Sequence, residues 1–509
     1  MSAYPETLGA LERSPYAAPH LARRTVKDEV RANLLTRLQQ GGPIFEGVIG
    51  YDESVVPQLV NALLSRHNFI LLGLRGQGKS RILRALVDLL DEKVPVVPGC
   101  EINDHPLAPI CKRCRRTVVD DTPIGWLARE DRYREKLATP DVTMADLIGD
   151  IDPIKAANER RALSDEEVIH YGILPRTHRG IFAINELPDL QTRIQVGLLN
   201  IMEERDVQIR GFPIRLPLDV CIVYTANPED YTNRGSIITP LKDRIDSQIM
   251  THYPASIEDA MSITSQEAWT KRGDLCEVRI PRLVAEIVEE IGFQARKSEF
   301  VDQNSGVSAR MSISAMENVV SNCERRAIRS GEKRVAPRIC DLYAAVPAIA
   351  GKIELVYEGE REGVIAVARR ILGQAVQAAF KRSFPDAYAS RPVKTRHGRP
   401  GPGTKDAPLD ETAYKPVLDW FARGSRVEIT DAMTSADYAK ALEQVPGLRA
   451  IAEQHLKPAA DELPLSMEFV LEGLHQNSLI AREDLDAAVS YKDMLKTMFE
   501  SMETTRGEE

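Results

Sequence analysis

A glycine-rich segment carries the spacing of a phosphate-binding loop, G-x-x-x-x-G-K-S. Its residues are Gly73, Leu74, Arg75, Gly76, Gln77, Gly78, Lys79 and Ser80. Glycines allow a tight turn that brings backbone N–H groups onto phosphate oxygens, Lys79 can reach the β- and γ-phosphates, and the Ser80 hydroxyl can ligate Mg²⁺. The apolar run Phe69–Leu72 before the loop predicts a buried strand, and leucines and isoleucines at helical spacing follow it. This order of strand, loop and helix predicts binding of ATP with Mg²⁺.

A second apolar run ends in polar residues that suit nucleotide hydrolysis. Residues 181–184 read Ile-Phe-Ala-Ile and are followed by Asn185 and Glu186. The pattern resembles the Walker B strand of P-loop ATPases, and Glu186 would polarise the attacking water. Asn185 stands where an Asp usually supports Mg²⁺, so a neutral amide replaces a carboxylate. We expect this replacement to weaken metal binding and turnover rather than nucleotide binding.

Two more polar positions follow in chain order. The run Val220–Tyr224 predicts a strand, and Asn227 comes just after it, before a proline. This resembles the sensor 1 strand of AAA+ ATPases, in which the Asn orients water near the γ-phosphate. Arg244, within Pro-Leu-Lys-Asp-Arg-Ile-Asp, resembles the arginine finger that reaches the nucleotide of a neighbouring subunit. Taken alone, Arg244 would be interpreted as a surface ion-pair residue.

The order of these motifs resembles the AAA+ superfamily, and more narrowly the ATPase subunit I of magnesium chelatase and its MoxR-like relatives. Three stretches carry the narrower resemblance: Leu147–Asp152, Tyr171–Gly180 and Glu203–Leu216. The last of these is similar to the family's pre-sensor 1 hairpin, and the first precedes its helix 2 insert. The resemblance covers about residues 40–345 and implies a homo-hexameric ring with ATP between subunits. It also places Arg310 where a sensor 2 arginine is expected.

A compact group of metal-ligand residue types lies between the first two motifs. Its members are Cys100, His105, Cys111 and Cys114. Structural zinc prefers four such ligands in a tetrahedron, and C-x2-C supplies two of them from one turn, with Asp104 and Glu101 available as outer partners. A loop with free thiols and a redox disulfide are the alternatives. The other four cysteines stand in apolar or helical contexts that indicate core positions.

The 509 residues have an ordinary globular composition, 43% hydrophobic and 28% charged, and a net charge of -9. We expect an α/β P-loop core, a parallel sheet flanked by helices, with a helical lid and an extra helical C-terminal domain. The expected parts are an N-terminal extension 1–40, core 41–255, lid 256–385, linker 386–411 and C-terminal domain 412–509 with a disordered tail. No membrane-length apolar run or signal peptide is evident, and the odd number of cysteines favours a reducing cytoplasm.

Several functions are compatible with these motifs. The leading hypothesis is an ATP-driven ring motor that remodels a separate partner protein, in the manner of MoxR-like ATPases, which work with proteins bearing a von Willebrand A domain. The metal-adhesion motif D-x-S-x-S of that domain is absent from the sequence, so such a partner would be another chain. The second hypothesis is the motor subunit of a magnesium or cobalt chelatase. A nucleic-acid-linked ATPase or transcription activator is disfavoured by the acidic net charge, and a nucleotide-binding scaffold with little turnover is kept open by Asn185.

Overall fold

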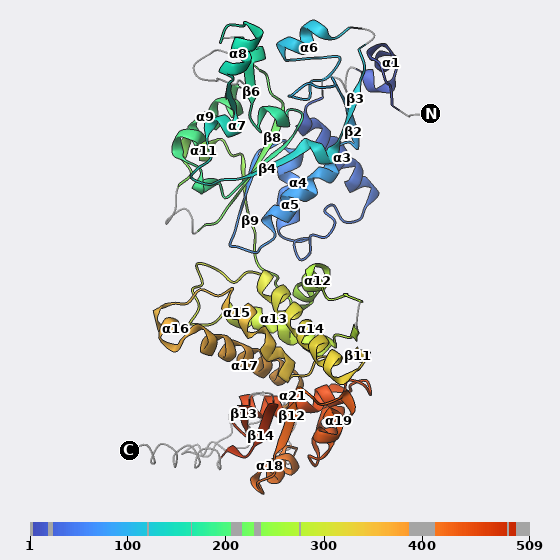
Figure 1. Cartoon of the computed structure of the whole chain (residues 1–509), viewed down its shortest axis with the longest axis vertical. Coiled ribbons are helices and arrows are strands. Elements are labelled where there is room, and N and C mark those ends of the chain that lie inside the picture. The colour runs from blue at the N-terminus through green and yellow to red at the C-terminus, as the bar shows by residue number, and fades with distance from the viewer. Residues whose placement is uncertain are drawn as a thin grey trace, which may run out of the picture. The chain divides into compact units, whose positions relative to one another are not determined.

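In a computed structural model the chain divides into two compact units, unit 1 with residues 1–253 and unit 2 with residues 254–509 (Figure 1). The structure describes residues 4–18, 24–119, 122–163, 165–204, 216–228, 236–273, 276–385, 413–485 and 488–494. Most of the expected pre-sensor 1 hairpin (205–215), the expected linker (386–411) and the tail after residue 494 lie outside these ranges.

The centre of unit 1 is a five-stranded sheet in the order β4-β7-β8-β1-β9, and every neighbouring pair is parallel. The strands are β1 (Phe69–Leu72), β4 (Tyr133–Leu137), β7 (Gly180–Asn185), β8 (Val220–Ala226) and β9 (Ser247–Met250). The register pairs Leu72 with Ala226 and Ile184 with Tyr224. The carboxyl ends of β1, β7 and β8 therefore meet at one edge of the sheet.

Helices cover both faces of this sheet. Side chains alternate between the faces of a strand, so Phe69 and Leu71 pack into one apolar core while Ile70 and Leu72 pack into another. The first core is closed by α3 (Val26–Gln40), α4 (Val55–Leu64) and α5 (Lys79–Ala85), and the second by α7 (Met144–Leu147), α9 (Thr192–Glu204) and α11 (Thr239–Asp243) (Figure 1). The predicted parallel α/β fold is confirmed.

The remaining elements of unit 1 are short. The helices are α1 (Leu8–Glu12), α6 (Lys112–Thr117) and α8 (Pro153–Glu159). The single 3-10 turns are η1 (Pro15–Ala17), η2 (Leu86–Leu89), η3 (Arg129–Arg132), η4 (Glu166–Val168), η5 (Pro175–Thr177) and η6 (Leu187–Asp189). Two antiparallel pairs join β2 (Lys93–Val96) to β3 (Gly125–Ala128) and β5 (Gly149–Ile151) to β6 (Ile169–Tyr171).

The three central strands coincide with the three apolar runs that the sequence singled out. The two outer strands were not predicted. β4 reads Tyr-Arg-Glu-Lys-Leu and β9 reads Ser-Gln-Ile-Met. An edge strand has a partner on one side only and is half exposed, so it lacks the continuous apolar run that marks a central parallel strand.

Unit 2 begins as a helical array and ends with a small antiparallel sheet. Its helices are α12 (Ile257–Glu267), α13 (Arg282–Ala295), α14 (Arg310–Ser330), α15 (Val346–Ala350), α16 (Tyr357–Glu362), α17 (Val364–Ser383), α18 (Lys415–Ala422), α19 (Ser435–Glu443), α20 (Leu448–Leu456) and α21 (Leu463–Gln476), with η7 (Cys340–Ala345). Strands β12 (Val427–Thr430), β14 (Ala488–Lys492) and β13 (Ala481–Leu485) form the sheet in that order, and β10 (Glu277–Val278) pairs with β11 (Arg334–Val335).

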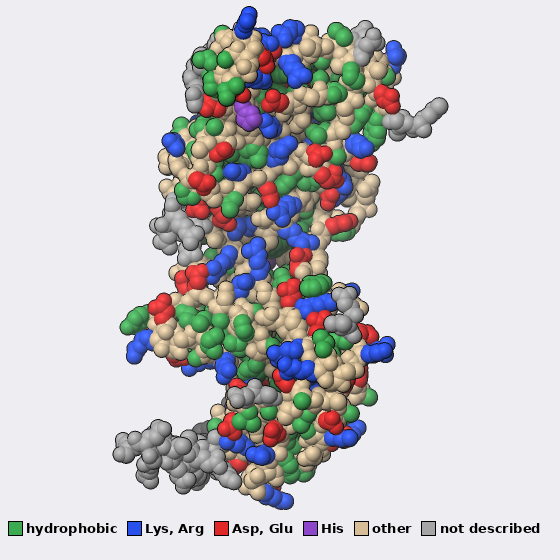
Figure 2. Space-filling view, viewed as in Figure 1, with side chains coloured by type: hydrophobic (Ala, Val, Ile, Leu, Met, Phe, Trp, Pro, Cys, Tyr) green, Lys and Arg blue, Asp and Glu red, His purple; other side chains and the backbone are tan. Residues whose placement is uncertain are grey.

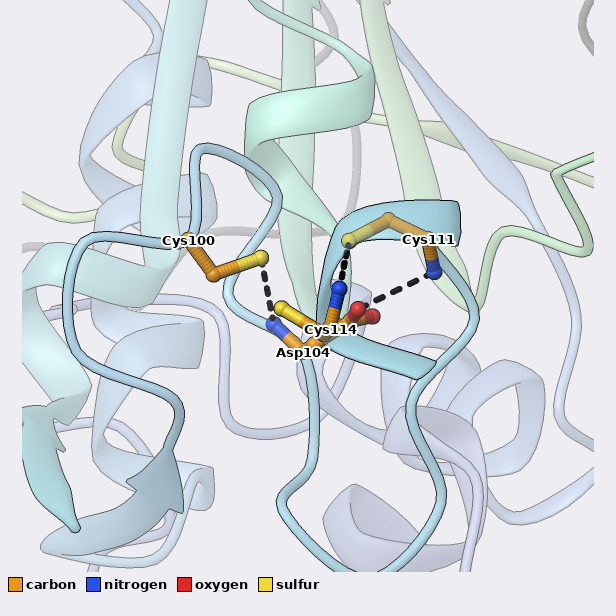
Figure 3. Close-up of side chains that lie close together, drawn as sticks. All are labelled: Cys100, Asp104, Cys111 and Cys114. Carbon is orange, nitrogen blue, oxygen red and sulfur yellow. Dashed lines mark hydrogen bonds between the residues drawn. The ribbon is translucent and has the colours of Figure 1, made fainter. Parts of the chain in front are cut away.

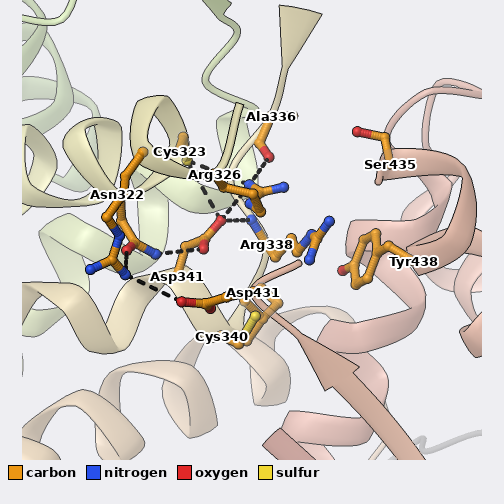
Figure 4. Close-up of polar contacts among 12 residues, drawn as sticks. Asn322, Cys323, Arg326, Ala336, Arg338, Cys340, Asp341, Asp431, Ser435 and Tyr438 are labelled. Carbon is orange, nitrogen blue, oxygen red and sulfur yellow. Dashed lines mark hydrogen bonds and ion pairs between the residues drawn. The ribbon is translucent and has the colours of Figure 1, made fainter. Parts of the chain in front are cut away.

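The expected lid and the expected C-terminal domain share one apolar core, which runs from Val284 to Tyr491. A buried polar network reinforces this union (Figure 4). Arg326 pairs with Asp341 at 2.7 Å, and Arg338 donates to the carbonyl of Met433 at 2.6 Å while lying over the ring of Tyr438. The three-stranded sheet in residues 427–492 was not predicted, because its polar alternation is that of short, partly exposed strands.

The visible surface carries Lys and Arg side chains interspersed with Asp and Glu (Figure 2). Among the described residues, no helix has both the length and the apolar character to cross a bilayer.

A buried ion pair fastens α3 to the sheet. Arg132 and Glu29 are 2% and 4% exposed, and the guanidinium donates to both carboxylate oxygens at 2.7 Å. Arg132 also donates to the carbonyl of Arg179, just before β7, and Glu29 accepts the backbone N–H of Asp91. Helix α3, which falls within the expected N-terminal extension, is thus an integral part of unit 1.

We expect Glu29→Ala to lower the free energy of unfolding by about 3–5 kcal/mol, because it leaves the Arg132 guanidinium buried without its carboxylate. Urea unfolding followed by circular dichroism measures the effect. Glu135→Ala is the matched control: it removes the exposed pair with Arg84, for which about 0–1 kcal/mol is expected. Equal shifts in the two variants would contradict the structural role given to the buried pair.

Candidate nucleotide site

The glycine-rich loop follows β1 directly at the carboxyl edge of the sheet. Gly73 donates its N–H to the carbonyl of Ala226 at the end of β8, and Lys79 begins α5. The Lys79 ammonium donates to the carbonyls of Gly73 and Leu74 within the loop, and Ser80 follows it in the first turn of α5. The loop therefore has its lysine turned into the concave side, where phosphate oxygens would replace the carbonyls as acceptors.

Three glycines of the loop are required by its geometry. Gly76 and Gly78 both have φ 73°, in the left-handed region that side chains disfavour. A Cβ on Gly73 would lie 2.0 Å from Thr251 Oγ1 and 2.1 Å from Gln77 Oε1, so any side chain there would displace the loop. Packing against Thr251 therefore closes the loop at Gly73.

Hydrogen bonds from residues 251–253, just after β9, and from Tyr51, just before α4, hold this loop in place. We call this set of residues the brace. Thr251 donates its hydroxyl to Gln77 Oε1 at 2.7 Å, and the Tyr253 hydroxyl donates to the carbonyl of Arg75 at 2.9 Å. The Tyr51 hydroxyl lies 2.7 Å from the carbonyls of both Gln77 and His252. Burial raises the pKa of Tyr51 to about 12, so it stays protonated and able to donate. Sequence patterns missed this brace, since its residues are about 200 positions apart.

The predicted catalytic pair lies at the end of β7, on the same edge. Glu186 has φ 56°, a left-handed conformation that costs a residue with a side chain about 1–3 kcal/mol. Thr225, buried in β8, accepts the N–H of Glu186 at 3.1 Å and donates to Asn185 Oδ1 at 3.2 Å. The hydroxyl of Thr225 therefore locks the pair to the neighbouring strand, and one lone pair of the Asn185 oxygen is left for a metal-bound water.

Asn227 completes the group on this edge. It follows Ala226, the register partner of Leu72, so it stands beside the entry to the loop. Its Oδ1 is buried and accepts no hydrogen bond within the described ranges. A buried acceptor of this kind is costly unless a ligand or water donates to it. The residues present thus fit a bound Mg²⁺–nucleotide with its attendant water.

Arg244 lies at the opposite end of the strands, near their amino ends. It caps the C-terminus of α11, donates to the carbonyl of Pro240 at 2.9 Å, and precedes β9. Asp246 pairs with Asn68, the residue before β1, so the length of β1, about 13 Å, separates this region from the loop. Arg310 begins α14 in unit 2. The structure therefore brings Lys79, Glu186 and Asn227 together at the carboxyl ends of the strands. It leaves Arg244 near the amino ends.

The predicted metal ligands are only partly assembled as expected. Cys100, Cys111 and Cys114 converge, but the fourth member is Asp104 rather than His105, and all four ligand atoms lie within 4.8 Å of one another (Figure 3). His105 turns away and its Nδ1 accepts the N–H of Leu107 at 3.0 Å. Burial lowers the pKa of His105 to about 3, so the ring is neutral.

Tyr51→Phe removes the hydroxyl that fastens the loop to residue 252. We expect the dissociation constant for ATP to rise about tenfold, because a carbonyl of the brace loses its donor, at a cost of about 1–3 kcal/mol. Titration with a fluorescent ATP analogue measures this. Tyr133→Phe is the control, since its hydroxyl binds Glu135 away from the loop. An unchanged affinity in Tyr51→Phe would show that the brace does not position the loop.

No family model matches the chain. Curated relatives include the magnesium-chelatase 38 kDa subunit of Acidiphilium rubrum, 26% identical over 238 residues, covering 43% of this chain and 61% of the relative. The magnesium-chelatase subunit ChlI of Synechocystis is 28% identical over 214 residues, covering 39% and 54%. The chain thus spans between half and two thirds of the length of these relatives.

Among solved structures, a complex of subunits BchI and BchD of magnesium chelatase matches at 18% identity and a TM-score of 0.32, covering 62% of this chain and 97% of the other. Over the aligned part of its sequence the chain is similar to subunit I of magnesium chelatase, and its parallel sheet presents the expected motifs at the carboxyl ends of the strands.

Proposed function

We propose that the chain is an ATPase that works as a ring of identical copies and drives a conformational change in a partner protein. One observation carries the proposal. The loop after β1, the Asn185–Glu186 pair at the end of β7 and Asn227 after β8 lie at the carboxyl ends of a parallel sheet, whereas Arg244 lies near the amino ends of its strands. A site with its arginine at the far ends of the strands suits a ring in which each copy completes the site of its neighbour.

Within one copy, the loop binds the triphosphate. Backbone N–H groups of residues 73–80 contact the phosphate oxygens, and Lys79 exchanges its loop carbonyls for the β- and γ-phosphates. Ser80 would ligate Mg²⁺, and Asn185 would hold a water of the ion through the remaining lone pair of its amide oxygen. A bound Mg²⁺ offsets the negative charge that develops on the phosphates during transfer.

Glu186 and Asn227 act on the attacking water. Glu186 accepts its proton, and the buried Asn227 Oδ1 accepts a hydrogen bond that fixes its orientation. The Thr225 hydroxyl keeps the carboxylate in place through the backbone of Glu186. Arg244 of the neighbouring copy spreads positive charge over the γ-phosphate, and the sensor 2 role of Arg310 stays a prediction from the sequence.

The partner is a separate chain in this proposal, as in MoxR-like ATPases that act on proteins with a von Willebrand A domain, and the ring is a hexamer. A second candidate, the motor subunit of a magnesium or cobalt chelatase, is favoured by the names of the curated relatives. The two share the ATPase site and differ in the partner. The test common to both is steady-state ATPase activity of the purified chain over a range of protein concentrations, which should rise cooperatively.

Glu186→Gln should bind ATP with near wild-type affinity and lose turnover by about 10²-fold or more, since the amide cannot accept the proton. It should also hold the ring together in the presence of ATP, because the nucleotide is trapped. Phosphate release and light scattering after size exclusion measure the two effects. A monomer with normal turnover would remove Glu186 from the mechanism. Glu135→Gln, which alters a carboxylate at the far edge strand, is the control.

Arg244→Ala should bind ATP normally and lose turnover by about 10³-fold, because the charge that it supplies is needed only in the transition state. The exposed neighbour Lys242 provides the control, and Lys242→Ala should stay within about twofold of the wild type. Mixing Arg244→Ala with the binding-deficient Lys79→Ala should restore part of the activity. In mixed rings an intact Arg244 then faces an intact loop. A mixture no more active than its components would contradict a shared site.

A further inference from the structure

We propose that Cys100, Asp104, Cys111 and Cys114 hold one zinc ion, as a structural site that is separate from the nucleotide. The four residues come from two short segments (Figure 3). Cys100 and Asp104 belong to the loop after β2, and Cys111 and Cys114 belong to the turn that opens α6. Asp104, Cys111 and Cys114 are buried, and Cys100 is half-buried.

The spacing of the ligand atoms matches a single ion. Zinc binds thiolate sulfur at about 2.3 Å, so two sulfurs of a tetrahedron lie about 3.8 Å apart. The three Sγ atoms and a carboxylate oxygen of Asp104 all lie within 4.8 Å of one another, a separation that small rotations of the side chains would close. A cluster of several iron atoms would hold its cysteines farther apart. Thiolates are soft ligands and select zinc over Mg²⁺ or Ca²⁺.

The buried carboxylate of Asp104 also points to a bound cation. It is 0% exposed, and no Lys, Arg or His side chain forms an ion pair with it in the described residues. Its oxygens instead accept the backbone N–H groups of Ile110 and Cys111 at 3.1 and 3.0 Å. Buried carboxylates are normally paired with a cation or bound to a metal, and each of these oxygens keeps a lone pair for one.

Backbone donors already support the sulfurs as they do in zinc turns. The N–H of Cys114 donates to the sulfur of Cys111 at 3.3 Å, and the N–H of Asp104 donates to the sulfur of Cys100 at 3.5 Å. Hydrogen bonds of this kind favour a thiolate over a thiol. The site therefore has its ligands, their depth and their outer hydrogen bonds in place.

The ion would hold α6 in the position from which it contacts the segment between β5 and β6. The helix α6 carries two of the ligands and forms ion pairs with that segment, from Lys112 to Asp165 at 2.8 Å and from Arg116 to Glu167 at 2.9 Å. The Cys100 loop contacts the sheet at its amino edge, where the Arg179 guanidinium donates to the carbonyl of Asn103. Zinc thus stabilises the part of unit 1 that lies away from the ATP-binding edge.

Metal analysis of the full chain, expressed in zinc-supplemented medium and purified without chelator, tests the site. We expect about one zinc per chain in the wild type and in Cys276→Ser, and none in Cys111→Ser. Native mass spectrometry of the wild type before and after chelation keeps the test valid if Cys111→Ser folds poorly. Cobalt substitution should give thiolate-to-metal charge-transfer bands that weaken in Cys114→Ser and persist in Cys276→Ser.

Hydrogen exchange supplies a readout independent of activity. Chelation should speed exchange in residues 97–118 and 149–171 and leave residues 69–85 unchanged. Several results would overturn the proposal: zinc in the wild type no higher than in Cys111→Ser, iron with inorganic sulfide, or an intact mass that shows a disulfide between these cysteines. Loss of zinc binding with ATPase activity intact would leave the proposed function standing, so the two proposals fail separately.

Discussion

The parallel register of β1, β8 and β7 is the constraint on which the candidate nucleotide site depends. Each strand is apolar on both faces and packs between two cores, so a slip by one residue would exchange the core side chains of one face with those of the other. The register therefore fixes where each strand ends. The loop, Glu186 and Asn227 share an edge because Leu72, Asn185 and Ala226 are the last residues of adjacent strands. Thr225 then converts this nearness into defined hydrogen bonds.

The burial of the strands also decides how much of the fold the sequence could predict. Central strands are recognisable in the sequence because burial on both faces demands continuous apolar runs, and the predicted catalytic residues follow those runs directly. The edge strands β4 and β9 are polar, and only pairing with β7 and β1 reveals them. The hydrogen bonds that hold the loop join Tyr51 to His252 and Gln77 to Thr251, and no local pattern connects residues so far apart.

The cysteine group shows a finer limit of sequence analysis. Spacing identified the three sulfurs, but it could not choose between the adjacent residues Asp104 and His105. Asn103 has φ 56°, a left-handed turn just before them, and this turn directs the carboxylate inward. His105 is left to accept a backbone hydrogen bond from Leu107. Neighbouring side chains in a loop point in different directions, so one backbone angle decides which of them can be a ligand.

The hydrogen bonds of the brace also connect the glycine-rich loop to the last residues of unit 1. Thr251 and Tyr253 hold Gln77 and Arg75 of the loop, and Tyr253 is bonded directly to Pro254, the first residue of unit 2. If phosphate contacts shift the loop, the carbonyl of Arg75 moves, and the Tyr253 hydroxyl must follow it or lose its acceptor. Following it displaces the backbone at the end of unit 1, whereas losing it costs about 1–3 kcal/mol. A movement of the loop is therefore coupled to the backbone at residues 251–253 through two hydrogen bonds.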